Sequence, residues 1–288
     1  MEILEKHKCF DGVLTVCQHQ SDVLKCPMKF SVFMPPRLMN RGLNGKIPFI
    51  TFLSGLTCTH DNFTTKSGAY SFAAQNGLAI IAPDTSPRGE DVADADTYDL
   101  GQGASFYINA AQEPWAKHYQ MESYITNELN DLVCEHYALM KNNQGICGHS
   151  MGGHGALTLG LKYPDKYKSI SAFAPIVAPT QVEWGQKIFN AYLGDGRDKW
   201  LEHDACELMM KSRDRSSYHP ILIHQGSADE YLEDHLKPYL FVNACEKAGQ
   251  KIKFHMCHGY DHGYYFVQSY IKHHVEHHAQ IMYGNMLR

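Results

Sequence analysis

The sequence predicts a single α/β domain, in which a mostly parallel central sheet has antiparallel strands at its N-terminal edge and helices on both faces. Three observations point to this architecture. Residues 1–35 alternate apolar and polar side chains, as antiparallel edge strands do. From residue 47 onward, apolar runs of strand length alternate with helical patterns, and no linker interrupts them. Residues 145–155 form a short apolar strand that turns into a glycine-rich helix start.

The individual elements follow from these patterns. A strand buried on both faces gives a nearly continuous apolar run, whereas a helix repeats apolar residues every three to four positions. We therefore expect buried strands over 47–53, 77–83, 145–149, 169–175 and 220–226, and strands with alternating side chains over 12–16, 28–34 and 251–256. Helices are expected over 69–75, 124–140, 156–161 and 234–248, and at the C-terminus. Residues 176–218 are expected to form an insertion over the rim of the sheet, within one domain that spans 1–288.

Composition and charge exclude several classes of protein. The formal net charge of -5 gives no electrostatic reason to expect nucleic acid as a partner. The nine cysteines contain no C-x-x-C pair, and the N-terminus lacks the apolar core of a signal peptide. No apolar run reaches the ~18 residues of a membrane span. Because unpatterned thiols favour a reducing compartment, we expect a soluble cytoplasmic protein without membrane contact.

The pattern Gly148-x-Ser150-x-Gly152 is typical of a nucleophile elbow, a tight strand-to-helix turn that exposes a serine hydroxyl above the sheet. Glycines fit such a turn because a Cβ two residues before or after the serine would strike the strand or the helix. The alternative is an ordinary glycine-rich loop with an incidental serine, because only three of the five positions are fixed. We interpret Ser150 as the candidate nucleophile.

A catalytic acid and base follow the elbow along the chain. Hydrolytic triads on this type of sheet have the chain order serine, acid, histidine, and Ser150, Asp229 and His262 have that order. Each follows a predicted strand, so all three can meet at one edge of the sheet. His262 would take the hydroxyl proton during attack on a carbonyl carbon, and Asp229 would hold the imidazole in the required tautomer. Weaker candidates are Asp234, Glu230 and Asp261 for the acid and His258 for the base.

The loop after the predicted strand 47–53 is expected to help form an oxyanion hole. We assign its two donors to the backbone N–H groups of Leu56 and Met151. Cys58 lies in the same loop, where a buried inert thiol is favoured over a reactive one. Candidate walls of a small acyl pocket are Trp184, Phe106 and Met151, and candidate substrate contacts by charge are Lys66, Arg88 and Lys187.

Two clusters contain metal-ligating residue types. Four carboxylates lie within nine positions, namely Asp91, Asp94, Asp96 and Asp99. They lack the glycine and the terminal glutamate of an EF-hand loop, so a solvated excursion is favoured over a calcium site. The C-terminal helix carries two histidine pairs at i, i+4 spacing, formed by His273 with His277 and His274 with His278. Because each pair supplies only two ligands, we expect a solvated helix face and no metal.

Five motifs occur in order along nearly the whole chain. They are Ser54-Gly55-Leu56-Thr57-Cys58, Pro83-Asp84-Thr85-Ser86-Pro87-Arg88-Gly89, Gly148-His149-Ser150-Met151-Gly152-Gly153-His154-Gly155-Ala156-Leu157, Trp184-Gly185-Gln186-Lys187 and Gly259-Tyr260-Asp261-His262. Together they closely resemble the S-formylglutathione hydrolases, also called the esterase D family. The chain departs from that family's pattern at Ser105, Glu183, His224 and Gly263.

The resemblance implies an α/β-hydrolase fold and cleavage of the thioester S-formylglutathione to formate and glutathione, the last step of glutathione-dependent formaldehyde detoxification. It also implies side activity on short-chain esters. The triad is carried onto Ser150, Asp229 and His262, the oxyanion amides onto Leu56 and Met151, and a cysteine near the active site onto Cys58. Enzymes that resemble this chain are typically cytoplasmic homodimers without a cofactor.

Two other functions stay open at this point. One is a general short-chain carboxylesterase or an acyltransferase of the same fold. The other is a non-catalytic relative that acts as a binding or scaffold protein. The presence of all three triad residues favours an enzyme.

Overall fold

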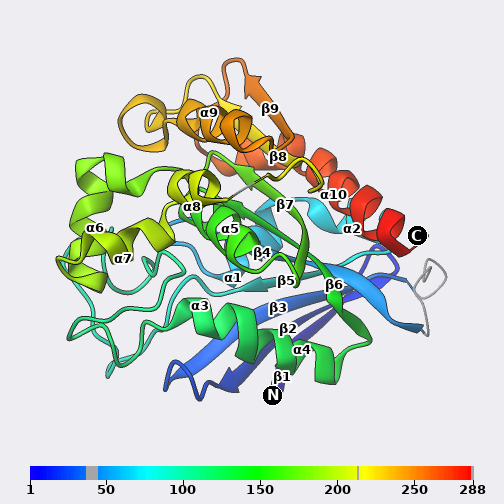
Figure 1. Cartoon of the computed structure of the whole chain (residues 1–288). Helices are drawn as coiled ribbons and strands as arrows, with labels where there is room; N and C mark the ends of the chain where they lie inside the picture. The colour runs from blue at the N-terminus through cyan, green and yellow to red at the C-terminus, as the bar shows by residue number, and fades with distance from the viewer. Residues whose placement is uncertain (37–44, 213, 287–288) are drawn as a thin grey trace.

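The computed structural model describes residues 1–36, 45–212 and 214–286 (Figure 1). Its strands are β1 (Glu2–Cys9), β2 (Gly12–Gln20), β3 (Pro27–Met34), β4 (Ile47–Leu53), β5 (Ala79–Pro83), β6 (Leu139–His149), β7 (Tyr167–Phe173), β8 (Ile221–Gly226) and β9 (Ile252–Cys257). Its α-helices are α1 (His60–Lys66), α2 (Ala69–Asn76), α3 (Met121–Ser123), α4 (Leu129–His136), α5 (Met151–Lys162), α6 (Glu183–Leu193), α7 (Arg197–Trp200), α8 (Ala205–Lys211), α9 (Pro238–Ala248) and α10 (Tyr264–Met286). Shorter 3₁₀ or π turns are η3 (Tyr124–Glu128), η4 (Pro179–Gln181), η5 (Leu201–His203) and η6 (Leu232–Leu236).

Within the described residues, nine strands form one sheet in the order β1-β2-β3-β5-β4-β6-β7-β8-β9. The strands β1, β2 and β3 pair antiparallel, and β3 is also antiparallel to β5. From β5 to β9 every pair is parallel. The predicted mostly parallel sheet with an antiparallel N-terminal edge is therefore confirmed. Because parallel strands end at the same edge, the loops after β4, β6, β8 and β9 lie together there.

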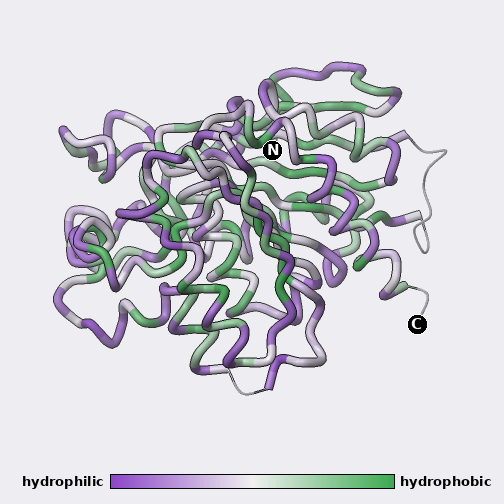
Figure 2. The backbone as a smooth tube through the Cα atoms, turned by 90° about the horizontal axis from the view of Figure 1, so that it is seen from above, coloured by the Kyte–Doolittle hydropathy of each residue, from purple (hydrophilic) through white to green (hydrophobic). Residues whose placement is uncertain are grey.

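Helices cover both faces of the sheet, as the sequence predicts. The helices α1, α2 and α10 pack together on one face, and α4, α5, α8 and α9 lie on the other (Figure 1). The central strands β4 and β5 are consequently buried along their whole length, whereas β1 is exposed along most of its length. Figure 2 shows hydrophilic stretches mainly on the outer turns of the chain. Among the described helices, none is both long and apolar enough to cross a membrane.

Two predictions concern the helix over 124–140 and the insertion over 176–218. A helix expected over 124–140 ends at His136, and β6 already begins at Leu139 because Leu139 pairs with Ile47 of β4. The expected insertion over 176–218 contains η4, α6, α7, η5 and α8. Its description as part of one domain stays a prediction.

Of the four histidines in the α10 pairs only His273 is exposed, so the expected solvated face is wrong for the other three. His274, His277 and His278 are 1%, 4% and 0% exposed, because this side of α10 packs on the sheet. Hydrogen bonds join the two ring nitrogens of His278 to the hydroxyls of Ser169 (2.5 Å) and Ser171 (2.8 Å) on β7. The imidazoles therefore act as buried polar links between α10 and the sheet.

Burial lowers the pKa of several imidazoles, because an apolar environment disfavours the charged form. The pKa is lowered to about 3 for His154, His203 and His224, to about 4 for His277, and well below its ordinary value for His149, His274 and His278. These side chains are neutral in the folded protein at neutral pH.

We expect the free energy of unfolding to fall when the pH is lowered from 7 to 5. In the unfolded chain the same imidazoles titrate near a pKa of about 6.5, so protons bind the unfolded state first and stabilise it. Stability is therefore complete above pH 6.5 and is lost as the pH falls toward the lowered values. Each such histidine contributes a loss of up to about 2 kcal/mol over this interval. Urea denaturation at both pH values measures the change.

The matched variants are His277→Gln, which removes a buried imidazole, and His136→Gln, which removes an exposed one. His277→Gln should reduce the loss between pH 7 and 5 by about 2 kcal/mol. His136→Gln should leave it unchanged. If the free energy of unfolding had the same pH dependence in the wild type, His277→Gln and His136→Gln, a lowered pKa of His277 would be contradicted.

Candidate active site

Ser150 lies at the turn between β6 and α5. Its backbone has φ 59° and ψ -119°, a positive-φ conformation that residues with a side chain rarely adopt. A Cβ on Gly148 would lie 2.0 Å from the carbonyl oxygen of Gly152, and a Cβ on Gly152 would lie 1.9 Å from that of Leu53. The turn therefore requires glycine at both positions, and its geometry is that of a nucleophile elbow.

Asp229 and His262 follow β8 and β9 and contact each other directly. Their Oδ2 and Nδ1 atoms are 2.6 Å apart, and the side chain of Asp229 is fully buried. The same carboxylate accepts hydrogen bonds from the side-chain amide of Gln225 (3.0 Å) and the backbone N–H of Tyr231 (2.9 Å). Asp229 is therefore fixed by neighbours on its own loop and strand while it orients the imidazole.

Close contact between two loops brings this pair together. The N–H of Ala228 donates to the carbonyl of Tyr260 (2.9 Å), and a Cβ on Gly226 would lie 2.3 Å from the same carbonyl oxygen. The loop after β8 is thus pressed against the loop after β9. This contact sets the distance between the acid and the imidazole.

A cavity of about 220 Å³ connects the elbow with the imidazole. It is lined by Gly55, Leu56, Thr57, Cys58, Tyr98, His149, Ser150, Ile176, Trp184, Tyr231, His235, Leu236, His262 and Tyr264. The structure thus brings Ser150 and His262 to one cavity, with Asp229 behind the imidazole.

The two predicted oxyanion donors are the backbone N–H groups of Leu56, in the loop after β4, and of Met151, at the start of α5. The N–H of Thr57, which has φ 63°, donates to the carbonyl of Gly103 (2.9 Å). No described residue accepts a hydrogen bond from the N–H of Leu56 or Met151. Met151 is the first residue of α5, and the first N–H groups of a helix have no partner within it.

Internal contacts hold the loop that carries Cys58. Its carbonyl accepts hydrogen bonds from the Thr85 hydroxyl (2.5 Å) and from Nη2 of Arg88 (2.9 Å), while Nε of Arg88 donates to Asp84 (3.0 Å). The guanidinium of Arg88, a candidate substrate contact by charge, is therefore bonded inside the protein. Burial raises the pKa of the Cys58 thiol, although Lys66 opposes the shift. The thiol is protonated at neutral pH, which favours the inert interpretation.

The rival acids and bases lie elsewhere. Asp261 accepts a hydrogen bond from the N–H of Gly263 (2.9 Å), and Asp234 and His258 are exposed. His149 also lines the cavity, and its ring centroid lies 4.7 Å from that of His262. Because His149 directly precedes Ser150, its position in the sequence could have predicted this.

Comparison with known proteins agrees with this geometry. The model of a family described as "Putative esterase" matches residues 21–280. The chain is 47% identical to the S-formylglutathione hydrolase of Paracoccus denitrificans (strain Pd 1222) over 261 residues, 91% of each chain. The chain belongs to the S-formylglutathione hydrolase family.

Solved structures of similar proteins have the same fold as this hydrolase. The S-formylglutathione hydrolase of Agrobacterium tumefaciens is 42% identical and superposes with a TM-score of 0.92, covering 98% of this chain and all of the other. A fluorophosphonate-binding serine hydrolase of Staphylococcus aureus is 21% identical, with a TM-score of 0.71 over 93% and 98% of the two chains. The second likeness shows the fold alone. The predicted α/β-hydrolase fold is confirmed.

The predicted pocket residues of this hydrolase divide into two groups. Cys58 and Trp184 line the cavity, but Phe106, Met151 and Lys187 do not, so that prediction is wrong for these three. Phe106 lies against Trp184, with ring centroids 5.5 Å apart in an edge contact, and is 1% exposed. Lys187 extends to Asp99 and forms an ion pair of 2.8 Å. Both residues therefore support the wall from outside the cavity.

The carboxylates of residues 91–99 are not all solvated, and the expectation is wrong for Asp99. Asp99 is 3% exposed and accepts hydrogen bonds from Lys187 and Trp184. Burial alone would raise the pKa of Asp99, but the bonds from Lys187, Thr97 and Trp184 hold it below its ordinary value. Across the part of the chain that the structure describes, no three histidine, cysteine, aspartate or glutamate side chains are placed to hold a metal.

Two positions where the hydrolase departs from its family's pattern have structural roles. The hydroxyl of Ser105 donates to the carbonyl of Thr85 (2.5 Å) and accepts from the N–H of Tyr107 (3.2 Å). His224 of β8 shares a hydrogen bond of 2.9 Å with His274 of α10. Neither contact includes a residue of the candidate triad.

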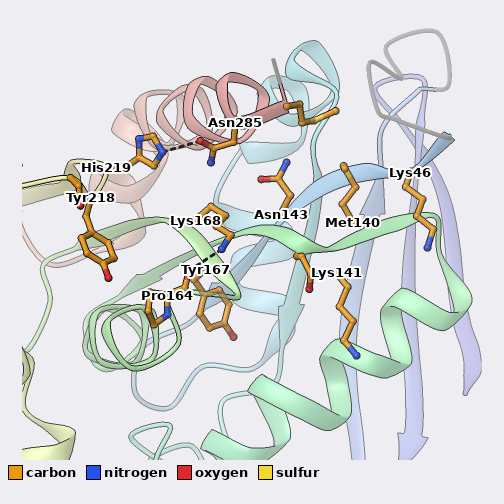
Figure 3. Close-up of a pocket in the computed structure, with 13 residues that line it drawn as sticks. Lys46, Met140, Lys141, Asn143, Pro164, Tyr167, Lys168, Tyr218, His219 and Asn285 are labelled. Atoms are coloured by element: carbon orange, nitrogen blue, oxygen red, sulfur yellow. Dashed lines mark hydrogen bonds between the residues drawn. The ribbon is translucent and has the colours of Figure 1, made fainter. Parts of the chain in front are cut away.

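A larger hollow lies at the opposite, N-terminal edge of the parallel strands (Figure 3). Its volume is about 1110 Å³, and Lys46, Lys141 and Lys168 are among its lining residues. Figure 3 shows Lys46 and Lys141 pointing away from the His219–Asn285 pair, and Lys168 donates to the carbonyl of Pro164 (3.1 Å). Its cations do not converge, and neither Ser150 nor His262 lines it, so the smaller cavity is the candidate active site.

We expect Gly152→Ala to lower the free energy of unfolding by roughly 1–3 kcal/mol or more, because the new Cβ must displace the end of β4. Urea denaturation measures the loss. Gly284→Ala is the control, since a Cβ there meets nothing within 4 Å. That change in α10 should leave stability equal or raise it by up to about 1 kcal/mol. A Gly152→Ala protein as stable as the wild type would show that the turn differs from this structure.

Proposed function

We propose that this hydrolase cleaves the thioester of S-formylglutathione to formate and glutathione through Ser150, His262, Asp229 and a formyl-enzyme. The observation that carries the proposal is the 2.6 Å contact between Asp229 and His262 beside a cavity that Ser150 also lines. The 47% identity with an S-formylglutathione hydrolase supports the choice of substrate.

The first half of the reaction forms the formyl-enzyme. The hydroxyl oxygen of Ser150 attacks the formyl carbon, and its proton passes to Nε2 of His262. Asp229 holds the other ring nitrogen and stabilises the imidazolium. The N–H groups of Leu56 and Met151 donate to the developing oxyanion, where one such donor contributes about 3 kcal/mol. The carbon–sulfur bond then breaks, and the imidazolium proton passes to the departing sulfur.

The second half releases formate. His262 removes a proton from a water molecule as its oxygen attacks the formyl carbon of the ester. The ester bond to Ser150 breaks, and the proton on His262 returns to the serine oxygen. Only the chain, the thioester and water take part in these steps.

The size of the cavity supports a small acyl group. At about 220 Å³ it is smaller than the roughly 300–1,000 Å³ of pockets that enclose drug-sized ligands. No lysine, arginine, aspartate or glutamate occurs among the described lining residues. The cavity therefore receives the formyl group and the thioester, while the charged ends of glutathione lie outside it.

A short-chain carboxylesterase is the second candidate, because an uncharged cavity accepts the acyl group of a small ester equally well. Steady-state kcat/KM values for S-formylglutathione and p-nitrophenyl acetate separate the two. A thioester that is not clearly preferred over the ester would contradict the proposed substrate.

We also propose a cytoplasmic homodimer. The support is the resemblance to cytoplasmic homodimeric enzymes and the absence of any C-x-x-C pair among nine cysteines. Analytical ultracentrifugation of the purified chain tests the dimer.

Ser150→Ala should reduce kcat for S-formylglutathione by several orders of magnitude, because no other hydroxyl replaces the nucleophile. Release of free thiol from the substrate measures the rate. Turnover near the wild-type value would reject the mechanism.

Asp229→Asn should lower kcat by roughly 10⁴-fold, because the amide no longer fixes the imidazole tautomer. Asp234→Asn makes the same chemical change at an exposed carboxylate of the neighbouring turn and should have little effect. The same thiol-release assay compares them. A large loss in Asp234→Asn with none in Asp229→Asn would reassign the acid.

A further inference from the structure

One buried carboxylate beside the site takes no part in the proposed triad. Asp99 is 3% exposed, although its neighbours Asp91 and Asp96 are exposed. Its Oδ2 accepts hydrogen bonds from Nε1 of Trp184 (2.8 Å) and Nζ of Lys187 (2.8 Å), and its Oδ1 accepts from Lys187 as well (3.0 Å). A buried carboxylate with these donors forms stronger, more directional contacts than a surface pair.

Asp99 lies next to two residues that line the cavity, Tyr98 and Trp184. Trp184, to which it is hydrogen-bonded, lines the cavity from α6, and Tyr98, the residue before it, lines the cavity from the loop. Trp184 and Lys187 are one helical turn apart, so both reach the same carboxylate. A single side chain therefore connects the loop after β5 with the wall formed by α6.

Among the residues that the structure describes, only Asp99 accepts a hydrogen bond from the indole of Trp184. Phe106 lies behind it at 5.5 Å and His235 lies 5.2 Å from it, but ring contacts of this kind permit tilting. The helix itself has a separate anchor, because the hydroxyl of Tyr192 accepts from the N–H of Gly101 (2.9 Å) and donates to the carbonyl of Ala104 (2.8 Å). Loss of Asp99 would thus free the indole while α6 stays attached to the loop.

The geometry points to Asp99 as a positioning residue that selects short acyl groups, by holding the indole of Trp184 as a fixed wall of the cavity. The assignment rests on the proposed acyl-transfer function of this cavity. A fixed wall excludes longer acyl chains, whereas a wall that can tilt admits them. The charge of Asp99 does not act on the reacting carbon; its effect is transmitted through the indole.

The test measures kcat/KM for p-nitrophenyl acetate and p-nitrophenyl octanoate. Asp99→Ala should raise the octanoate-to-acetate ratio by roughly tenfold, the scale of effect that a methylene or two has in an apolar pocket. Asp99→Asn keeps an acceptor for the indole N–H and should have a ratio near that of the wild type. Asp96→Ala, an exposed position on the same loop, is the control and should change nothing.

A double variant tests whether Asp99 acts through Trp184 or by loosening the whole wall of the cavity. Trp184→Phe removes the same hydrogen bond from the other side and should also raise the ratio. Because both changes release one wall, Asp99→Ala combined with Trp184→Phe should raise the ratio no further than the larger single change. If Asp99→Ala does not fold, Trp184→Phe and Asp99→Asn still carry the comparison.

Three results would overturn the inference. They are an unchanged ratio in folded Asp99→Ala or Trp184→Phe, an equal rise in Asp99→Asn and Asp99→Ala, and additive effects in the double variant. The ratio is measured on esters alone, so a failure to cleave S-formylglutathione would reject the proposed substrate and leave this test intact. Loss of ester turnover in Ser150→Ala confirms that the ratio reports the same site.

Discussion

The contact on which the site depends is the close approach of the start of α5 to the end of β4. A Cβ on Gly152 would lie 1.9 Å from the carbonyl oxygen of Leu53, so the helix begins directly against the neighbouring strand. On the other side, the N–H of Ser150 donates to the carbonyl of Phe173 at the end of β7 (2.9 Å). The serine is thus held by both neighbours of β6, and the register of the parallel sheet determines where its hydroxyl lies.

Backbone strain is concentrated at this same edge of the sheet. Besides Ser150, the non-glycine residues with positive φ include Thr57, Phe106, Tyr107 and Ala174, at 63°, 51°, 54° and 41°. Strained residues of this kind cost about 1–3 kcal/mol each and persist only where surrounding contacts fix them. Such contacts are present: the N–H of Thr57 is bonded to Gly103, that of Tyr107 to the hydroxyl of Ser105, and that of Ala174 to the carbonyl of His224. The edge therefore combines strained backbone with bonds that leave it little freedom.

The sequence was sufficient for the sheet, the elbow and the order of the candidate triad, because each leaves a local trace. The central strands β4 and β5 are nearly continuous apolar runs, and the elbow needs glycine at two fixed distances from Ser150. Asp229 and His262 stand directly after strands whose ends must meet. The start of β6 was missed because Leu139 has the apolar spacing of the preceding helix, and only its pairing with Ile47 makes it part of a strand.

Burial of polar side chains could not be predicted, because it depends on partners far away along the chain. Asp99 and its exposed neighbour Asp96 are the same residue type, and the difference lies in a lysine and a tryptophan on α6. His278 is likewise buried because two serines of β7 meet its ring nitrogens. In both cases one polar side chain joins two layers, since a buried polar group is stable only where its partners are correctly placed. The link at Asp99 fixes the indole of Trp184 relative to the loop after β5, and the link at His278 joins α10 to β7. Each bond thus adds a specific contact between two layers to the packing of the apolar core.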